Sequence, residues 1–515
     1  MLAQLDTKTV YTFMDSMVTI EEYVKRAKNL GYQTIGIMDI HSLYAAYGFL
    51  EACQKEGLRP IIGCELDWKY NNGQSEILTK LIALSTKGYQ NLMKISTAKM
   101  TGQDDFDSIR QFLQDIAVIV PFKDGVDKLD LGVDYYIGIY SDTPVQSFDH
   151  PVLPLHTVRY FQENQLESLQ VLRAIKDNIP LNQVNEIEHQ QVLLSAERLT
   201  MSFMDRYPQA ISNLAQLVEN VSYHLDKKVK LPRFNRQRPA VEELREKAQA
   251  GLVEKQLDSP LYQERLDKEL AIIHQMGFDD YFLIVWDLLR FGRSQGYYMG
   301  MGRGSAVGSL VAYALNITGI DPVKHNLLFE RFLNSERYSM PDIDIDIPDV
   351  HRSDFIRYVR DRYGTTHAAQ IVTYSTFGAK QAIRDVFKRF GTPEYELTNI
   401  TKKISFRDSL ESAYQRNAAF RQIINSKIEY QKAFAIARQI EGQPRQTSIH
   451  AAGVVVSDED LTDTIPLKIG DDMLITQYDA HAVEANGLLK MDFLGLRNLT
   501  FVQKMAELVK KKYNK

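Results

Sequence analysis

Cysteine is almost absent from this sequence of 515 residues. The chain has only Cys53 and Cys64, and they do not form a C-x-x-C pair. This spacing argues against a structural zinc site, which draws its ligands from closely spaced cysteines and histidines. Because thiols stay reduced inside the cell, the composition predicts a reduced, cytoplasmic protein.

Long apolar runs are also missing. The sequence contains no stretch of about 18 apolar residues, which argues against a membrane-spanning helix and against a membrane as partner. The first residues, MLAQLDTKTVYTF, lack a basic segment followed by an apolar core, which argues against a secretory signal. The length is typical of two to four domains, and no internal repeats are evident.

Positive charge is not in surplus over the whole chain. Lys and Arg number 61 against 66 Asp and Glu, which gives a formal net charge of −5. Residues 376–447 differ, because they hold 13 Lys and Arg against 7 Asp and Glu. A basic region inside an acidic protein fits either a DNA-facing surface or a solvated helical hairpin, and charge alone does not separate the two.

The hydrophobic pattern divides the chain into regions of different type. The first 200 residues alternate strands, such as TIGIMDI and RPIIGCELDW, with helices, which predicts a parallel sheet or barrel. Residues 200–290 are predicted to be helical. Residues 296–375 read as loop, helix, strand, helix and strand, and 376–447 are helical again with a break at 391–393. The rest returns to strands and ends in an amphipathic helix, so we expect a longer natural chain.

The segment from Met340 to Pro348 alternates acidic and apolar residues. On a strand, its isoleucines face one side, while Asp342, Asp344 and Asp346 face the other. Carboxylates this close repel one another and need a counter-cation, and ligands that are all oxygen suit Mg²⁺ or Mn²⁺. Two such ions are the arrangement that polymerases use for phosphoryl transfer.

Two other interpretations of this segment exist besides a metal site. One is an edge strand with a solvated acidic face, which three alternating aspartates between prolines make unusual. The other is a calcium-binding loop. That loop needs glycine at its sixth position and glutamate at its twelfth, where this sequence has Ile347 and Ser353, so it is excluded.

A third carboxylate is available from a later strand. In the segment LLKMDF, Lys490 and Asp492 share one strand face by the same alternation. Asp492 could complete the metal site, and Lys490 could meet a phosphate oxygen as a point charge. Taken alone this pair also fits an ordinary solvated strand face.

A glycine-rich turn, Met299-Gly-Met-Gly-Arg-Gly-Ser305, precedes the apolar segment 306–317, which is predicted to be a helix. Its three glycines permit a tight turn with exposed amides, and Ser305 is placed at the start of the helix. A helix N-terminus with free N–H groups binds phosphate, and Arg303 adds charge. The turn is not a Walker A loop, and it could also be a plain structural connector.

Several long segments carry a family resemblance. Residues 302–349, 370–386, 448–457 and 488–499 resemble the palm region of bacterial DNA polymerase III alpha subunits, of the DnaE type rather than the PolC type. The first 200 residues resemble the family's PHP domain more weakly. The resemblance implies an α/β multidomain fold. A PHP-type distorted β/α barrel is followed by a polymerase-beta-like nucleotidyltransferase palm with a helical thumb inserted.

The resemblance also implies domain bounds and site residues. The PHP-like domain would span 1–205, the first part of the palm 206–375, the thumb 376–447 and the second part of the palm 448–515. The catalytic and metal-binding residues would be Asp344, Asp346 and Asp492, with Asp342 a less expected ligand. The residues that hold the dNTP phosphates would be Gly304, Ser305, Lys490, Arg303, Arg331 and Arg337.

The first region departs from the family's metal-binding pattern. Where the family has histidines, this sequence has Gln4, Asp6 and Lys8, and a later Asp-x-His pair reads Thr157-Val-Arg159. Cations cannot bind a metal, but they can neutralise leftover carboxylates. We therefore expect Lys8 and Arg159 to form ion pairs with the carboxylates that remain, namely Asp15, Asp39 or Glu65. This PHP domain would then hold no metal and have no phosphoesterase or proofreading activity.

The function implied by the resemblance is template-directed DNA synthesis with two Mg²⁺ ions, Mn²⁺ being an alternative. Its partners would be primer–template DNA and dNTPs, with the sliding clamp and other replisome subunits bound by regions outside this sequence. Two other functions stay open. The chain could be a non-catalytic fragment that binds metal and dNTP but lacks the fingers region. A PHP-type phosphoesterase is the other, and the missing histidines argue against it.

Overall fold

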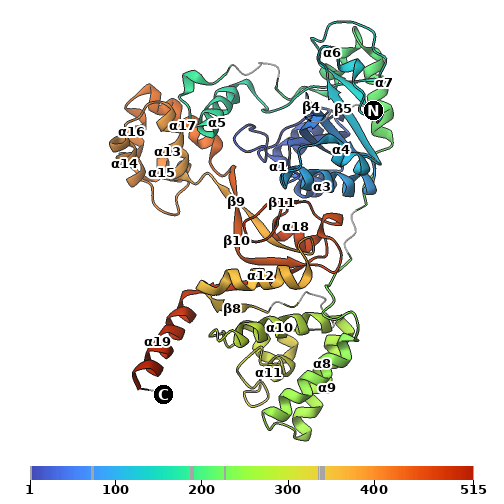
Figure 1. Cartoon of the computed structure of the whole chain (residues 1–515). Coiled ribbons are helices and arrows are strands. Elements are labelled where there is room, and N and C mark those ends of the chain that lie inside the picture. The colour runs from blue at the N-terminus through green and yellow to red at the C-terminus, as the bar shows by residue number, and fades with distance from the viewer. Residues whose placement is uncertain are drawn as a thin grey trace. The chain divides into compact units, whose positions relative to one another are not determined.

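The computed structural model describes residues 3–70, 73, 75–185, 191–224, 228–334, 336, 341 and 343–513. The chain divides into two compact units (Figure 1). The first unit comprises Met1–Leu225 and Thr373–Ser448, and the second comprises Asp226–Val372 and Ile449–Lys515.

The first unit is built on a seven-stranded sheet whose spatial order follows the chain from β1 to β7. Its strands are β1 (Ala3–Gln4), β2 (Thr34–Ile40), β3 (Arg59–Tyr70), β4 (Ser75–Ala83), β5 (Ile116–Pro121), β6 (Tyr136–Ile139) and β7 (Val152–Pro154). The strands predicted from TIGIMDI and RPIIGCELDW are confirmed as β2 and β3. The expectation of a parallel sheet was only partly right, because β4 pairs antiparallel with both β3 and β5.

Helices alternate with these strands along the chain and follow them. They are α1 (Ile20–Asn29), α2 (Ala46–Glu56), α3 (Thr86–Met100), α4 (Phe106–Ile109), α5 (Leu166–Asp177), α6 (Ala196–Met204) and α7 (Pro208–Glu219). The α7 face that carries Leu214, Leu217 and Val218 is buried in one apolar cluster with Met38 of β2 and Ile119 of β5. This shared core ties the last helix of the region to the central strands.

A helical lobe, residues 377–447, completes the first unit. Its helices are α13 (Ala379–Arg389), α14 (Glu394–Lys402), α15 (Leu410–Arg416), α16 (Ala418–Asn425) and α17 (Ile428–Ile440). The break predicted at 391–393 is confirmed, since Gly391 has a φ of +76° and α14 starts after Pro393. The lobe shares its apolar core with α5, where Leu169 and Leu172 join Phe387 and Ile436 (Figure 1).

The second unit is built on a six-stranded sheet with the order β11-β12-β9-β10-β13-β8. Its strands are β8 (Ile345–Pro348), β9 (Ala368–Thr376), β10 (Pro444–Val456), β11 (Leu467–Lys468), β12 (Ile475–Thr476) and β13 (Leu489–Leu496). Its helices are α8 (Ala240–Glu254), α9 (Pro260–Met276), α10 (Asp279–Ser294), α11 (Leu310–Ala314), α12 (Arg352–Tyr363), α18 (Ala480–Ala485) and α19 (Arg497–Tyr513). Strand β9 and strand β10 run from this sheet into the helical lobe.

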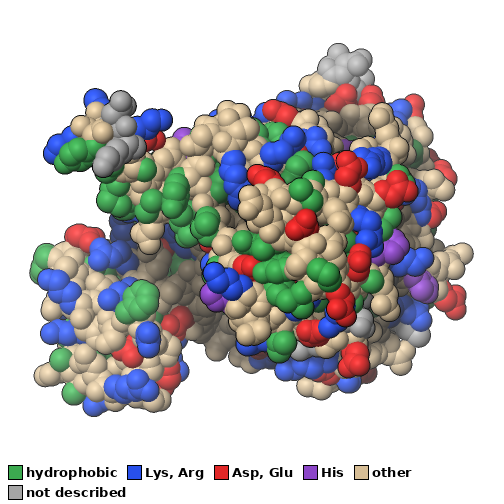
Figure 2. Space-filling model, turned by 90° about the horizontal axis from the view of Figure 1, so that it is seen from below, with side chains coloured by type: hydrophobic (Ala, Val, Ile, Leu, Met, Phe, Trp, Pro, Cys, Tyr) green, Lys and Arg blue, Asp and Glu red, His purple; other side chains and the backbone are tan. Residues whose placement is uncertain are grey.

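Two surface properties agree with the composition. Within the part of the chain that the structure describes, no helix combines the length and the apolar character needed to cross a membrane. On the face seen in Figure 2, Lys and Arg side chains are interspersed with Asp and Glu side chains. Positive charge on this face is therefore local, as the balanced composition predicts.

Candidate active site

Strand β8 presents the aspartates as the alternation predicts. Ile343, Ile345 and Ile347 are all buried in the core of the second unit, which also contains helix α10. Asp344 and Asp346 belong to the alternate positions, with 20% and 10% of their side chains exposed. The strand is shorter than predicted, however, because it starts at Ile345 and leaves Asp344 just before it.

The predicted third carboxylate lies on the neighbouring strand. Strand β13 pairs parallel with β8, and Phe493 stands opposite Ile345. Asp492 and Asp344 each come one residue before this pair, although Asp344 lies just outside β8. Lys490 shares a face of β13 with Asp492, since its Nζ lies 2.8 Å from Oδ2 of Asp492. We call Asp344, Asp346 and Asp492 the strand carboxylates.

Basic side chains supply the counter-cations that the repelling aspartates need. The guanidinium group of Arg303 joins two of them, with Nη1 at 2.9 Å from Asp344 and Nε at 3.3 Å from Asp346. Asp492 receives Lys490, but its Oδ1 atom is buried and has no hydrogen-bond partner. Half of the Arg303 side chain is exposed, so this cation can leave the carboxylates without disturbing the core.

The described residues contain no group of three or more His, Cys, Asp or Glu side chains close enough to hold a metal ion. The strand carboxylates therefore lie on adjacent strands without forming a closed ligand cage in this arrangement. Two residues from the predicted site, Asp342 and Arg337, lie outside the described residues. Arg331 ends a short 3-10 turn, is exposed, and has no carboxylate partner among the residues with described positions.

The glycine-rich turn packs directly against β8. The amide of Gly300 donates a hydrogen bond of 2.9 Å to the carbonyl oxygen of Asp346. A Cβ atom at position 300 would come within 2.5 Å of the Asp346 Cβ, so only glycine permits this approach. Gly302 and Gly304 have φ values of +76° and +68°, which glycine adopts without strain. Arg303, between them, is thereby brought to the strand carboxylates.

The helix predicted to start at Ser305 was wrong. Residues Gly304–Gly308 form a 3-10 turn, and the helix that follows, α11, begins only at Leu310. Ser309 is its N-cap, with Oγ accepting from the amide of Ala312.

A buried carboxylate caps the start of α11. Glu269 of α9 accepts hydrogen bonds from the amides of Leu310 and Val311 and from the hydroxyl of Ser309, at 2.9–3.1 Å. Burial raises the pKa of Glu269, while these amides and Arg265 partly offset that effect. The amides of Leu310 and Val311 at the start of α11 are thus occupied by a carboxylate.

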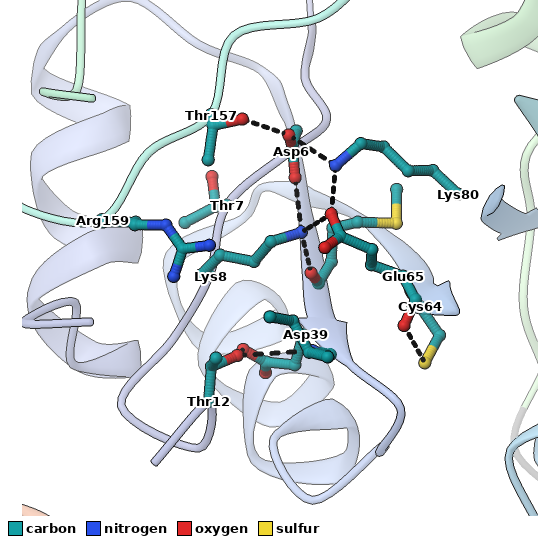
Figure 3. Close-up of polar contacts among 12 residues, drawn as sticks. Asp6, Thr7, Lys8, Thr12, Asp39, Cys64, Glu65, Lys80, Thr157 and Arg159 are labelled. Atoms are coloured by element: carbon teal, nitrogen blue, oxygen red, sulfur yellow. Dashed lines mark hydrogen bonds and ion pairs between the residues drawn. The ribbon is translucent and has the colours of Figure 1, made fainter. Parts of the chain in front are cut away.

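The first unit holds a second carboxylate cluster, made of Asp6, Lys8, Glu65 and Lys80 (Figure 3). We call it the N-terminal cluster. The Nζ of Lys8 lies 2.8 Å from Asp6 and 2.7 Å from Glu65, and it also donates to the carbonyl oxygen of Met38. Lys80 contacts the same two carboxylates. The predicted ion pair of Lys8 with Glu65 is present. Asp6 and Lys80 form further ion pairs with the same two residues.

The second predicted ion pair is also present. Arg159 Nη1 lies 2.6 Å from Oδ2 of Asp15, and Arg173 of α5 contacts the other oxygen at 2.6 Å. Asp39 forms no ion pair among the described residues. Instead its carboxylate accepts hydrogen bonds from the Thr9 amide and from the hydroxyls of Thr9 and Thr12. Burial raises the pKa of Asp39 even though these hydrogen bonds oppose the shift.

Burial and charge act against each other in the N-terminal cluster. Lys8 and Asp6 are fully buried, and Lys80 is 2% exposed. Burial alone would raise the pKa of Asp6 and Glu65, but the ammonium groups of Lys8 and Lys80 outweigh it and lower both. A cavity of about 690 Å³ adjoins the cluster, and its lining includes Glu65, Lys80 and Arg159. The ion pairs thus hold the carboxylates charged beneath this cavity.

Three of these residues were not predicted from the sequence, namely Lys80, Glu269 and Arg173. A signal existed for Lys80. The dipeptide Asn72-Gly73 is a sequence typical of hairpin turns, and a hairpin turn sets strand register. The pairing of β3 with β4 does bring Lys80 opposite Glu65. Nothing in the local sequence marks Glu269 as a helix cap, because the groups that it caps lie 40 or more residues away.

Comparison with known protein families identifies the type of domain in each part of the chain. Residues 4–129 match the PHP domain family, and residues 241–495 match the bacterial DNA polymerase III alpha NTPase domain family. The chain is therefore a PHP domain followed by a polymerase-type NTPase domain, in an α/β multidomain architecture with mixed sheets.

Similarity to individual proteins identifies the family more specifically. The DNA polymerase III subunit alpha of Streptococcus pyogenes serotype M3 is 62% identical over all of this chain and half of its own length. The subunits of Halalkalibacterium halodurans and Bacillus subtilis are each 35% identical, over 98% and 99% of this chain. The chain belongs to the family of bacterial DNA polymerase III alpha subunits. It spans about half the length of the relatives it matches.

Proposed function

We propose that this chain carries the nucleotidyl-transfer centre of a replicative DNA polymerase, which adds deoxynucleotides to a primer 3′-hydroxyl on a template. The observation that supports this most strongly is the juxtaposition of three elements. Asp346 lies on β8 and Asp344 directly before it, Asp492 lies on the paired strand β13, and the glycine turn packs against Asp346. Carboxylates beside a phosphate-binding turn are the parts that phosphoryl transfer requires.

The strand carboxylates have the ligand chemistry that divalent metal ions prefer. Their ligand atoms are all oxygen, as Mg²⁺ prefers, and the buried Oδ1 of Asp492 lacks a partner that a cation would provide. Asp344, Asp346 and Asp492 would hold two Mg²⁺ ions, with Mn²⁺ as a substitute. When bound, such ions lower the pKa of the attacking hydroxyl and stabilise the departing pyrophosphate.

The remaining residues would position the triphosphate. Arg303 now neutralises Asp344 and Asp346, and its exposed side chain could turn to a phosphate once metal takes over that role. Gly304 and Ser305 offer backbone amides at a turn whose neighbouring helix start is already capped. Lys490 would contact a phosphate oxygen from β13. Arg331 is a further candidate because it is exposed and has no described ion-pair partner.

The proposed domain roles follow the same scheme. Residues 206–375 and 448–515 would form the palm, 376–447 the thumb, and 1–205 the PHP-like domain. Substrates would be primer–template DNA and dNTPs. The sliding clamp and other replisome subunits would bind parts of the relatives that this sequence does not span.

In the first unit, we propose that ion pairs have taken the place of a metal centre. Lys8 and Lys80 lie between the carboxylates of Asp6 and Glu65, and Arg159 holds Asp15. The domain would then serve as a scaffold without phosphoesterase or proofreading activity. Stoichiometric Mn²⁺ or Zn²⁺ bound by an Asp344→Asn/Asp346→Asn chain, and lost on adding Glu65→Ala, would refute this role.

Primer extension tests the main proposal. The chain is assayed with Mg²⁺, dNTPs and a labelled primer–template, beside the Asp344→Asn/Asp346→Asn variant. We expect extension by the unchanged chain only, with duplex binding retained by the variant. Variant activity within about tenfold of the unchanged chain would contradict the assignment.

One alternative, a fragment that binds metal and dNTP without polymerising, is compatible with a match over half of the relatives' length. If neither chain extends the primer, Mg²⁺-dependent binding of a fluorescent dNTP tests whether the fragment contains a nucleotide site. Binding by the unchanged chain, lost in the variant, supports the nucleotide site in this fragment. Absence of binding from both refutes it.

A further inference from the structure

Gly453 of β10 leaves a space on the side of the sheet to which Asp492 of β13 points. The two residues stand opposite each other in the antiparallel pairing of β10 with β13. Side chains of opposite residues project from the same face of a sheet, with Cβ atoms about 4.5–5.5 Å apart. Val454, the next residue, points the other way, because it is buried in the core that contains the isoleucines of β8. A side chain at position 453 would therefore lie beside Asp492.

The imidazole ring of His450 takes up this space. A Cβ atom on Gly453 would come within 3.0 Å of the His450 Nδ1 atom and within 3.0 Å of the Ile371 Cδ1 atom. The ring therefore lies over Gly453, on the face that carries Asp492, with Ile371 of β9 nearby. Glycine at position 453 leaves the room that the imidazole needs.

Backbone amides determine which nitrogen of the His450 ring carries the hydrogen. Nδ1 accepts hydrogen bonds from the amides of Gly453 at 2.7 Å and Ala452 at 3.2 Å. A hydrogen on Nδ1 would collide with both amide hydrogens, so the ring hydrogen is on Nε2. Among the residues with described positions, Nε2 has no hydrogen-bond partner, and the side chain is half-buried. Nε2 is thus a hydrogen-bond donor that offers no lone pair to a metal ion.

The order of the strands separates His450 from the glycine-rich turn. The turn packs against β8, the edge strand of the sheet, through Gly300 and Asp346. Strand β13 comes next and β10 follows it, so Asp492 lies between β8 and the strand of His450. In phosphoryl transfer, the attacking and leaving oxygens lie roughly in line. A nucleotide whose phosphates lie at the turn would therefore be attacked from the side of β10.

We propose that His450 contacts the end of the primer, with its Nε2–H group donating a hydrogen bond to an oxygen of the last phosphodiester. This inference rests on the proposed function and adds a substrate contact on the primer side of the site. A phosphodiester suits this donor, because an N–H group forms a charge-assisted hydrogen bond with a phosphate oxygen. The contact would help to align the 3′-hydroxyl, and a small misplacement of reacting groups slows a reaction strongly.

Two substitutions separate the outer donor of His450 from its backbone anchor. In His450→Asn, the side-chain oxygen can still accept from the amides of Ala452 and Gly453, but no donor reaches the position of Nε2. In His450→Gln, the side-chain nitrogen can reach that position, whereas the acceptor for the two amides is lost. A purely structural role predicts that His450→Asn behaves normally and His450→Gln does not. A donor role predicts the reverse.

The test measures equilibrium binding of a fluorescein-labelled primer–template by the whole chain, with Mg²⁺ and without dNTP, so that no extension occurs. Each chain is tested with an ordinary primer and with a primer whose last linkage is an uncharged methylphosphonate. For the unchanged chain, we expect the methylphosphonate to weaken binding about tenfold, as for the loss of one hydrogen bond to a charged group. His450→Asn should bind the ordinary primer about tenfold more weakly and respond little to the methylphosphonate, because both changes remove the same contact.

Three controls accompany this measurement. His450→Gln should keep most of the response to the terminal methylphosphonate. A methylphosphonate placed several linkages upstream should affect the unchanged chain and His450→Asn equally. His325 is an exposed histidine outside the sheet of the second unit, and His325→Ala should behave as the unchanged chain does.

Several outcomes overturn the inference. Equal responses of the unchanged chain and His450→Asn to the terminal methylphosphonate would do so, as would weaker binding of the ordinary primer by His450→Gln than by His450→Asn. Failure of the unchanged chain to bind primer–template would overturn it as well. The proposed nucleotide site would survive these results, because Mg²⁺-dependent dNTP binding is measured without DNA. Thermal unfolding of His450→Asn, expected to match the unchanged chain, shows that the fold is intact.

Discussion

The chain contains two sets of carboxylates that basic side chains neutralise, and the two differ in accessibility. In the N-terminal cluster, Lys8 is fully buried and Lys80 nearly so. At the strand carboxylates, by contrast, half of the Arg303 side chain is exposed. A buried ammonium group cannot leave without exposing unpaired charge, whereas an exposed guanidinium group can move at little cost. The same pairing chemistry therefore holds the cations in place in the first unit and leaves the Arg303 side chain of the second unit freer to move.

The largest effect should come from breaking the buried set. Lys8→Met removes one ammonium group and leaves Asp6 and Glu65 to share Lys80. Loss of one partner from a buried ion pair costs about 3–5 kcal/mol. We expect this loss in the free energy of unfolding, measured by urea denaturation with a probe in the first unit.

An exposed pair supplies the control for Lys8→Met. Half of the Lys28 side chain is exposed, and it pairs with Glu56 at 3.2 Å. Lys28→Met should change the free energy of unfolding by less than about 1 kcal/mol. Equal losses in the two variants would show that burial of the N-terminal cluster is not what makes it matter.

Acid should act on the same buried set. The pKa values of Asp6 and Glu65 are lowered in the folded state from their ordinary values of 3.8 and 4.5. Their charged forms therefore stabilise the fold above about pH 4.5, and this contribution is lost as the pH falls. We expect acid unfolding, followed by circular dichroism, to begin at higher pH in Lys8→Met. An unchanged acid transition would contradict the role of Lys8 in lowering these pKa values.

The geometry of the strand carboxylates depends on the close approach of the glycine-rich turn to Asp346, and not on buried charge. In Gly300→Ala, the new methyl group would meet the Asp346 Cβ at 2.5 Å, so the turn or the carboxylate must shift. We expect Mn²⁺ affinity, measured by electron paramagnetic resonance, to fall about tenfold, because metal sites tolerate little displacement. Gly378→Ala is the matched control, since its Cβ meets nothing within 4 Å, and it should bind Mn²⁺ normally.

The comparison also shows which features the sequence could predict. The alternation predicted correctly that Ile343, Ile345 and Ile347 are buried and that Lys490 and Asp492 share a face of β13, because a two-residue period fixes the face of a strand. The roles of the aspartates stay predictions. The start of α11 was mispredicted, because a buried glutamate 40 residues away caps it. Local sequence patterns predict which residues share a strand face and where turns occur. Helix caps and ion pairs cannot be predicted this way, because they depend on which distant segments fold together.

Arg303→Met should give the smallest change in affinity. It tests most directly whether a metal ion displaces the Arg303 side chain from the carboxylates. In the unchanged chain, Arg303 lies on Asp344 and Asp346, so a metal ion must displace it. Without the guanidinium group, the two carboxylates repel and should bind Mn²⁺ about threefold to tenfold more tightly. Affinity for the dNTP triphosphate, measured at saturating Mn²⁺, should fall instead, because the phosphates lose a cation. Opposite signs for the two ligands would identify Arg303 as a side chain that passes from carboxylate to phosphate. Weaker binding of both would show that it only holds the site together, as Lys8 does in the first unit.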